Sequence, residues 1–108
     1  MPKKHRVEIT VTAERDLYEI RDYIALDKPV AAQRWLLRIA KQIRSLKTMP
    51  LRHEVIPEAQ EIGIEYRHML LGPYRTIYRV EKERVIVVRV IHGARLLDPS
   101  FLFGSENT

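Results

Sequence analysis

A break of three residues between two amphipathic helices is the feature that most restricts how this chain can fold. Apolar residues recur at helical spacing before the break and again after it, so each helix has one stripe to bury. The first stripe consists of Ala13, Leu17, Ile20 and Ile24, and the second of Ala32, Leu36, Ile39, Ile43 and Leu46. The break is Asp27-Lys28-Pro29, and its proline disfavours helix just before it while fitting the first turn of a new helix. Because the link is this short, the sequence predicts an antiparallel helical hairpin that extends to about Lys47.

Strand patterns flank the hairpin on both sides. Before it, apolar residues alternate with polar ones over Val7–Val11, which indicates a half-buried strand, and Thr12 can cap the first helix. After it, a polar loop over residues 50–61 leads to three short strands, predicted at 62–71, 73–81 and 84–92. The turns at Gly72-Pro73 and Lys82-Glu83 are tight, so these three strands are expected to be antiparallel neighbours.

The last of these strands contains Val85-Ile86-Val87-Val88, which is apolar on both faces, and we place it centrally in the sheet. Asp98-Pro99 is expected to open a short C-terminal helix or turn that carries Phe101. The predicted fold class is therefore α+β with the order β-α-α-β-β-β, a helical hairpin packed on a small antiparallel sheet. A length of 108 residues suits a single domain over 1–108.

Several classes of site are excluded by what the sequence lacks. There is no cysteine, hence no disulfide and no thiolate ligand. The four histidines are scattered and there is no glycine-rich phosphate loop, so we expect neither a metal site nor a cofactor. The basic start of the chain leads into a strand pattern and not into an apolar segment, and the longest apolar stretches are too short to span a bilayer. We therefore expect a cytoplasmic protein with no membrane partner.

The net charge of +5 is distributed unevenly along the chain. Residues 13–27 carry five acids against two arginines, residues 28–53 carry seven cations and no acid, and residues 54–66 carry four acids and no lysine or arginine. Within the basic segment, Arg34, Arg38 and Lys41 form a separate stripe on the second predicted helix. This basic stripe is expected to bind an anionic partner, either nucleic acid or an acidic protein. The alternative is a helix face that only contacts solvent.

Several short strings, in their order along the chain, resemble the RelE/ParE toxin superfamily. In the two predicted helices they are Ala13-x-x-Asp16-Leu17-x-x-Ile20 and Pro29-x-Ala31-Ala32-x-Arg34-Trp35. In the predicted sheet they are Tyr66-Arg67, Gly72-Pro73-Tyr74-Arg75-x-x-Tyr78 and Val90-Ile91-His92-Gly93-Ala94-Arg95, which look like the motifs of ParE-like members. No single string is specific, but together they extend over nearly the whole chain.

The resemblance implies a growth-arresting toxin of a type II toxin–antitoxin system, of the plasmid-stabilisation type. Such a toxin is neutralised by a cognate antitoxin encoded beside it, so a toxin–antitoxin hetero-oligomer is expected. ParE-like members are generally described as inhibiting DNA gyrase without cleaving anything, whereas RelE-like members cut messenger RNA on the ribosome. Because a shared fold does not fix function, the resemblance leaves both activities open.

The nuclease alternative has candidate catalytic residues in this sequence. Arg75 and Arg95 match two arginines of RelE-like nucleases, one on the strand after the hairpin turn and one just beyond the last strand. Two guanidiniums can clamp a phosphate, although Arg75 can instead be an exposed strand arginine and Arg95 can instead pair with Asp98. His92 is the best candidate base, because an unperturbed imidazole titrates near pH ~6.5, and its alternative role is to hydrogen-bond at the end of the sheet.

Two departures from the nuclease pattern weigh against cleavage. Phe101 stands where the catalytic tyrosine of RelE-type enzymes would sit, and the loop before the sheet offers Arg52-His53-Glu54 instead of a pair of lysines. His53 and His68 remain as further candidate bases. We therefore expect a ParE-like toxin that binds a target such as DNA gyrase. The alternatives are a metal-independent, ribosome-dependent endoribonuclease that acts on messenger RNA, and a family member that has lost toxicity and serves as a binding module.

Overall fold

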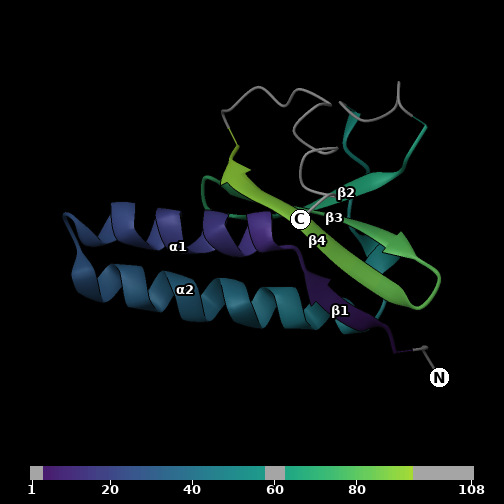
Figure 1. The fold of residues 1–108 in the computed structure, drawn as a ribbon, viewed down its shortest axis with the longest axis horizontal. Helices are drawn as coiled ribbons and strands as arrows, with labels where there is room; N and C mark the ends of the chain where they lie inside the picture. The colour runs from purple at the N-terminus through teal and green to yellow at the C-terminus, as the bar shows by residue number, and fades with distance from the viewer. Residues whose placement is uncertain (1–3, 58–62, 94–108) are drawn as a thin grey trace.

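Two helices pack on one face of a four-stranded sheet in the computed structural model, which describes residues 4–57 and 63–93 (Figure 1). In chain order the elements are β1 (Arg6–Ile9), α1 (Val11–Ala25), α2 (Pro29–Arg44), β2 (Tyr66–Leu71), β3 (Tyr74–Glu81) and β4 (Arg84–His92). Two short 3₁₀ turns, η1 (Ser45–Lys47) and η2 (Pro50–Arg52), follow α2. The predicted α+β class and order of elements are confirmed. Within the described residues, no helix is both long enough and apolar enough to cross a membrane.

The helical hairpin forms where the short break predicts it. Pro29 is the first residue of α2, and the predicted end at about Lys47 holds because η1 continues the helical path beyond Arg44. The inner stripes are buried: Leu17 of α1 and Ile39 of α2 belong to one core cluster with the sheet. Burial of these two apolar stripes is what joins the hairpin to the sheet.

The first helix begins earlier than predicted, and its cap is Thr10 and not Thr12. β1 ends at Ile9, so Thr10 keeps an extended backbone (φ −67°, ψ 157°) and its side chain accepts a hydrogen bond from the Ala13 N–H at 3.1 Å. Thr12 already lies in the first turn, where its backbone is helical and cannot serve as a cap. The predicted strand over Val7–Val11 is shortened for the same reason.

The sheet has the order β1-β4-β3-β2 and is mixed, not wholly antiparallel. The pairs β2–β3 and β3–β4 are antiparallel, as the tight turns predict, but β1 runs parallel to β4, with Val7 opposite Val85. A parallel pair requires a long crossover, and here the helical hairpin and the two intervening strands supply it. The prediction of a wholly antiparallel sheet was therefore wrong, although the predicted fold class was correct.

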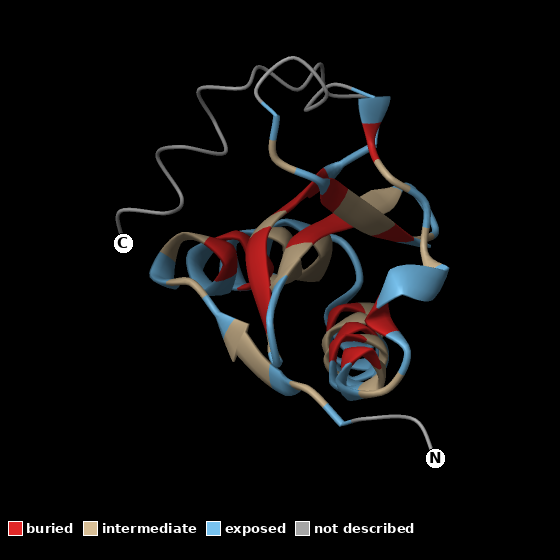
Figure 2. Ribbon diagram, turned by 90° about the vertical axis from the view of Figure 1, so that its right-hand side faces the viewer, coloured by how far each residue is buried: buried red, intermediate tan, exposed pale blue. Residues whose placement is uncertain are grey.

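The central position of β4 is confirmed, because it lies between β1 and β3 and because Val85–Val88 are all buried. Buried residues form a cluster on each face of the sheet. Figure 2 shows the buried residues along its central strands in red. On the helix face, Val85 and Val87 pack with α1 and α2. On the opposite face, a second cluster consists of Ile56, Tyr66, Ile77, Ile86, Val88 and Ile91.

A buried carboxylate on α1 continues the bonding of β4 beyond the end of β1. The last residue of β1 pairs with Val87, and from there the Thr10 N–H donates to the Val87 carbonyl at 3.1 Å and the Thr10 hydroxyl to the Val88 carbonyl at 3.2 Å. Asp16 then accepts the Val90 N–H at 3.0 Å and two hydrogen bonds from the Arg89 guanidinium, at 2.7 and 3.0 Å. The start of α1 thus replaces the missing strand, which satisfies backbone groups that burial would otherwise leave unpaired.

The remaining strand boundaries agree with the sequence except at the start of β2. The predicted strands 73–81 and 84–92 correspond to β3 and β4 to within one residue, whereas β2 begins at Tyr66 instead of 62. The predicted C-terminal helix or turn at Asp98-Pro99, with Phe101, lies outside the residues that the structure describes.

The Asp16–Arg89 pair yields a stability prediction. Replacing Arg89 with Met leaves the Asp16 carboxylate, whose residue is 8% exposed, without its cation. Breaking a buried ion pair from one side costs about 3–5 kcal/mol, and we expect a decrease of that size in the free energy of unfolding, measured by urea denaturation. The matched control is Arg21→Met, because Arg21 pairs with Asp22 on the surface, where such pairs contribute about 0–1 kcal/mol. Equal decreases in the two variants would contradict a special role for the buried pair.

Candidate functional site

Arg75 is placed by β3 and is largely buried, with 7% of the residue exposed. Its Nε donates a hydrogen bond to Nδ1 of His68 at 3.0 Å. The two residues meet because Leu70 pairs with Arg75 in the β2–β3 register, which makes His68 a diagonal neighbour of Arg75 on the same face. Arg75 is thus an interior strand arginine with a side-chain partner, and not the exposed one that the sequence offered as its alternative.

His68 holds Arg75 in place and is not arranged as a free base. Because Nδ1 accepts the hydrogen bond from Arg75, the ring proton of neutral His68 lies on Nε2. That nitrogen faces a carboxylate oxygen of Glu54 at 3.8 Å. A proton on Nδ1 would break the bond to Arg75, so the chain Glu54–His68–Arg75 orients the guanidinium.

His92 and Arg75 line one hollow of about 530 Å³ at the Gly72-Pro73 end of the sheet, together with His68. Gly93 closes one side of this hollow by a close backbone approach, since its N–H donates to the Pro73 carbonyl at 2.6 Å. A Cβ at this position would come within 3.1 Å of that oxygen, so glycine is the residue that fits. The structure therefore brings two of the three predicted catalytic residues to the same place.

The ring of His92 is exposed and packs edge-on against Tyr74, with centroids 5.6 Å apart. Tyr74 in turn contacts Trp35 of α2 at 5.4 Å. His92 also lines a second hollow of about 340 Å³, between α1 and the end of β4. His92 therefore borders two concave surfaces, and its aromatic contacts fix it at the end of the sheet.

Two predicted features of the nuclease site, Arg95 and Phe101, lie outside the described residues. Among residues 4–57 and 63–93, no group of three or more metal-ligand side chains is close enough to hold an ion. With a cation and imidazoles around one hollow, the described part of the site can bind an anion such as a phosphate or a carboxylate.

The basic stripe lies on the outer face of α2. Arg34, Arg38 and Lys41 are all exposed, as helical spacing predicts. Two apolar residues on the same outer surface, Val30 and Leu37, are 65% and 70% exposed. Val30, Arg34, Leu37 and Lys41 recur at intervals of three and four residues, so the face combines cations with unburied apolar side chains.

Another group around His53 fastens the segment before β2 to the sheet. The Tyr78 hydroxyl donates to the Pro50 carbonyl, and Arg67 donates to the His53 carbonyl at 2.6 Å. Burial raises the pKa of Tyr78 to about 12. The His53 ring packs edge-on against Tyr78, and its Nε2 is buried with no hydrogen-bond partner in the part of the chain described. Burial, followed by the charges of Arg52, His68 and Arg67, lowers the pKa of His53 below 6.5.

The sequence suggested His53 and His68 only as candidate bases and did not indicate what these two residues do in the structure. The signal for His68 was present in the pairing of β2 with β3, but it requires the register and not only the strand boundaries. No sequence signal indicated the burial of His53, because the loop that carries it reads as polar.

Comparisons with known proteins agree with this geometry. Residues 7–97 match the family model described as the ParE toxin of the type II toxin–antitoxin system parDE. The chain is 36% identical over 88 residues to toxin RelE2 of Caulobacter vibrioides, an alignment that covers 81% of this chain and 93% of the relative.

Two solved structures share the fold. The chromosomal ParDE system of P. aeruginosa gives a TM-score of 0.67 at 19% identity and covers 82% of this chain and 96% of its own. The toxin–antitoxin complex RelBE2 of Mycobacterium tuberculosis gives 0.59 at 27% identity and covers 86% and 95%. The first of these likenesses bears on the fold alone.

The lowered pKa of His53 predicts that acid destabilises the fold. Because the folded protein binds this proton less readily than the unfolded chain, the contribution of His53 is fully present above pH about 6.5 and is lost as the pH falls through the lowered pKa. We expect the free energy of unfolding to decrease over this range, and His53→Gln to reduce the decrease. Denaturant titrations at a series of pH values measure both slopes. An identical slope in the variant would assign the acid sensitivity to other groups.

Proposed function

This chain belongs to the ParE toxin family of type II toxin–antitoxin systems, and we propose that it arrests bacterial growth by binding a protein target such as DNA gyrase. The family model spans most of the chain, and the similar RelE2 protein is itself named a toxin. Both support the assignment as a toxin. The choice of target rests on the chemistry around Arg75, and gyrase would place the toxin's action in the cytoplasm.

The burial of Arg75 is the observation that favours a toxin that binds its target over a toxin that cleaves RNA. A nuclease needs a cation that reaches the phosphate and a base whose acceptor nitrogen faces the substrate. Here Arg75 is 7% exposed, and its Nε donates to Nδ1 of His68, which occupies the acceptor of the nearest imidazole. Phe101, in place of the tyrosine of RelE-type enzymes, supports the same proposal from the sequence.

Ribosome-dependent cleavage of messenger RNA is the second candidate. It is favoured by the hollow that Arg75, His68 and the exposed His92 line together, and by the similarity to RelE2. In this mechanism Arg75 and Arg95 would stabilise the phosphate, and His92 would transfer the proton.

The outer face of α2 is the surface that we assign to the antitoxin. Its cations suit an acidic segment, and the exposed Leu37 and Val30 give that segment an apolar anchor. An amphipathic helix that buries such anchors is a common way for a partly disordered protein to bind. The similar structure from Mycobacterium tuberculosis is a toxin–antitoxin complex, RelBE2, which supports a partner of this kind.

The first functional prediction separates the two mechanisms. Induced alone, the protein should stop growth, and co-expression of the neighbouring gene should restore it. Purified toxin should inhibit supercoiling by gyrase and leave messenger RNA intact on translating ribosomes. Discrete cuts within codons would support the nuclease mechanism instead, if His92→Gln abolishes them and the variant still folds. Normal growth at high soluble expression would contradict a toxin activity in that host.

The second functional prediction concerns the antitoxin. Reversing the charges of Arg34, Arg38 and Lys41 together should slow association and weaken its salt dependence, because exposed charges mainly set the association rate. Leu37→Ala should instead raise the dissociation rate, since buried anchors determine how long a complex lasts. Binding kinetics over a range of ionic strength measure both effects.

The matched control for the antitoxin experiment reverses Lys4, Lys47 and Lys82, which changes the net charge equally but away from α2. If this control slows association as much as the α2 variant does, the effect comes from net charge and the assignment of the α2 face is wrong.

A further inference from the structure

The excess positive charge of this protein is concentrated at one end of the fold. We call this region the basic end, and it comprises the cations Lys4, Arg6, Arg44, Lys47, Arg52, Arg79, Lys82 and Arg84 with the acids Glu8, Glu81 and Glu83. Eight cations and three carboxylates leave +5. Residues 4–57 and 63–93 together hold 17 lysines and arginines against 10 aspartates and glutamates, a net charge of +7, so this end carries most of the excess of the described residues.

Three segments that are distant in sequence meet at the basic end: residues 4–8, residues 44–52 and residues 79–84. The residues just before β1 contact η1 and the residue after it. The His5 N–H donates to the Lys47 carbonyl at 2.7 Å, and the backbone of Lys4 forms an isolated antiparallel β-bridge with Thr48. Arg52 of η2 donates to the Thr48 carbonyl at 3.5 Å. On the other side, the Arg6 N–H donates to the Glu83 carbonyl of the β3–β4 turn at 2.8 Å.

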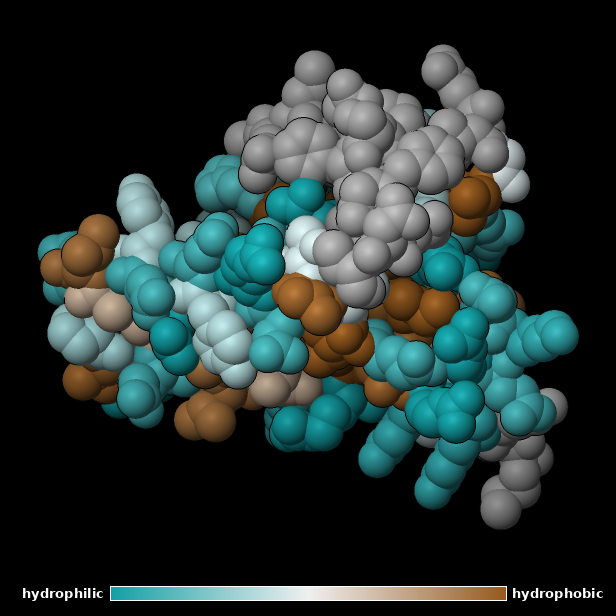
Figure 3. All heavy atoms as spheres, in the orientation of Figure 1, coloured by the Kyte–Doolittle hydropathy of each residue, from teal (hydrophilic) through white to brown (hydrophobic). Residues whose placement is uncertain are grey.

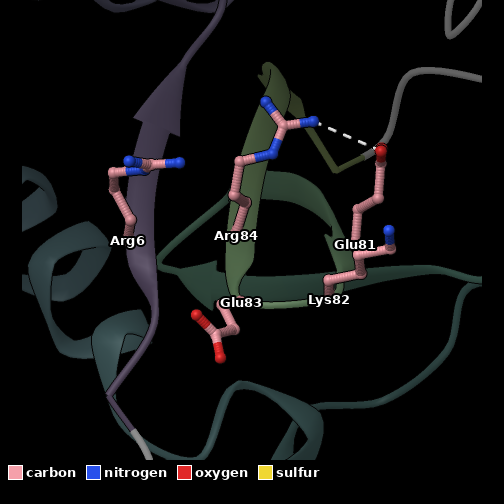
Figure 4. Close-up of a pocket in the computed structure, with 5 residues that line it drawn as sticks. All are labelled: Arg6, Glu81, Lys82, Glu83 and Arg84. Atoms are coloured by element: carbon pink, nitrogen blue, oxygen red, sulfur yellow. Dashed lines mark hydrogen bonds and ion pairs between the residues drawn. The ribbon is translucent and has the colours of Figure 1, made fainter.

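The surface of this end is strongly hydrophilic. Figure 3 shows hydrophilic side chains gathered over β1 and the β3–β4 turn. Between them lies a hollow of about 600 Å³, lined by Arg6, Lys82, Arg84 and two glutamates (Figure 4). The location of this hollow, at the opposite end of β3 from Arg75, separates it from the candidate site described above.

Two of the three carboxylates of the basic end, those of Glu8 and Glu81, are already engaged by arginines. Glu8 lies 3.4 Å from Arg84 and 3.7 Å from Arg6, and Glu81 lies 3.2 Å from Arg84 and pairs with Arg79. The hydrogen bond from Arg79 lowers the pKa of Glu81, so this acid stays ionised and paired.

Among the described residues, five exposed cations at this end have no such partner, and one of them, Arg52, instead donates to the backbone carbonyl of Thr48. Lys4, Arg44, Lys47 and Lys82 are exposed, and none of them has a carboxylate within ion-pair distance in residues 4–57 and 63–93. They come from the start of β1, the end of α2, η1 and the β3–β4 turn. Their side chains can therefore neutralise an external anion without giving up an internal ion pair.

We propose that the basic end binds the phosphate backbone of a nucleic acid. Phosphates at regular spacing are matched by separate point charges spread over several elements, which is the arrangement seen here. The outer face of α2 differs, because there Leu37 and Val30 lie among the cations and offer a protein partner an apolar anchor. The inference goes beyond the toxin activity, and it requires neither the antitoxin surface nor the hollow at Arg75.

The test measures binding of the purified full chain to a short labelled DNA duplex, and to an RNA duplex of the same sequence, by fluorescence anisotropy. The basic-end variant is Lys4→Gln, Arg44→Gln, Lys47→Gln and Lys82→Asn. Asparagine is chosen at 82 because Lys82 has φ +57° and asparagine tolerates that conformation. The control variant is Arg15→Gln, Lys28→Gln, Arg34→Gln and Arg38→Gln, four exposed cations elsewhere whose removal changes the net charge equally.

The wild-type chain should bind at least one duplex with a steep salt dependence between about 50 and 200 mM, and the slope of log K against log salt should fall by about 0.9 for each phosphate that a variant no longer neutralises. The basic-end variant should therefore bind more than about tenfold more weakly at low salt, and the control variant should keep most of the wild-type affinity. Unfolding curves of both variants show whether the fold is retained. If the quadruple basic-end variant does not fold, the single variant Lys47→Gln replaces it, with an expected change of about 0.9 in the slope of log K against log salt.

Three results would overturn the proposal. One is the absence of salt-dependent binding by the wild-type chain, and another is an equal decrease of affinity in the two variants, which would indicate net charge alone. The third is binding of polyglutamate as tight as that of either duplex, because the basic end would then recognise acidic protein. A preference for the DNA or for the RNA duplex identifies which nucleic acid the surface takes. The antitoxin and the toxin's target are absent from this experiment, so its outcome is independent of the proposed function.

Discussion

The buried carboxylate of Asp16 is the contact on which the arrangement of the helices and the sheet depends. It joins α1 to the Arg89 guanidinium and to the backbone of Val90, at the point where β1 no longer covers β4. A buried charge is tolerated only when its hydrogen bonds are satisfied. If α1 shifted along β4, Asp16 would lose these bonds and its burial would destabilise the fold. The position of α1 then fixes α2 through the hairpin. Val90 also lies just before His92 and Gly93, so the same contact sets the edge of the hollow at Arg75.

Much of the fold could be predicted because the signals for it are local. The break at Asp27-Lys28-Pro29, the tight turns and the two-sided apolar run in β4 each depend on neighbouring residues, and each was confirmed. The parallel pairing of β1 with β4 was not predicted, because it joins residues nearly eighty positions apart and no turn specifies it. The choice between Thr10 and Thr12 as the cap depended on where β1 ends, which the alternation over 7–11 does not determine.

The candidate site could be predicted only as a set of residue types. Arg75 and His92 were named as candidates by residue type, and the structure places both at one hollow, yet the sequence could not show that Arg75 is buried and bonded to His68. That contact depends on the β2–β3 register, since a slip of one residue would place His68 on the opposite face. The charge map had a similar limit. Arg34, Arg38 and Lys41 were recognisable because one helix carries them, whereas the basic end is assembled from three segments that are distant in sequence and is visible only in three dimensions.

The separation of these surfaces has a consequence for how they can act together. The hollow at Arg75 and the β3–β4 turn lie at opposite ends of β3, and eight residues of strand at about 3.3 Å each put them roughly 25 Å apart. One phosphate therefore cannot contact both, and at about 3.4 Å per base pair a duplex would need roughly seven base pairs to reach from one to the other. The basic end can thus hold a nucleic acid by its backbone while the residues around Arg75 remain available to a different ligand. Binding at the basic end leaves Arg34 and Arg38 of the α2 face free, because they lie further along the helix, towards Pro29, whereas Lys41 lies one turn from Arg44. The fold can accordingly accommodate a nucleic acid at the basic end and a neutralising partner towards the Pro29 end of α2.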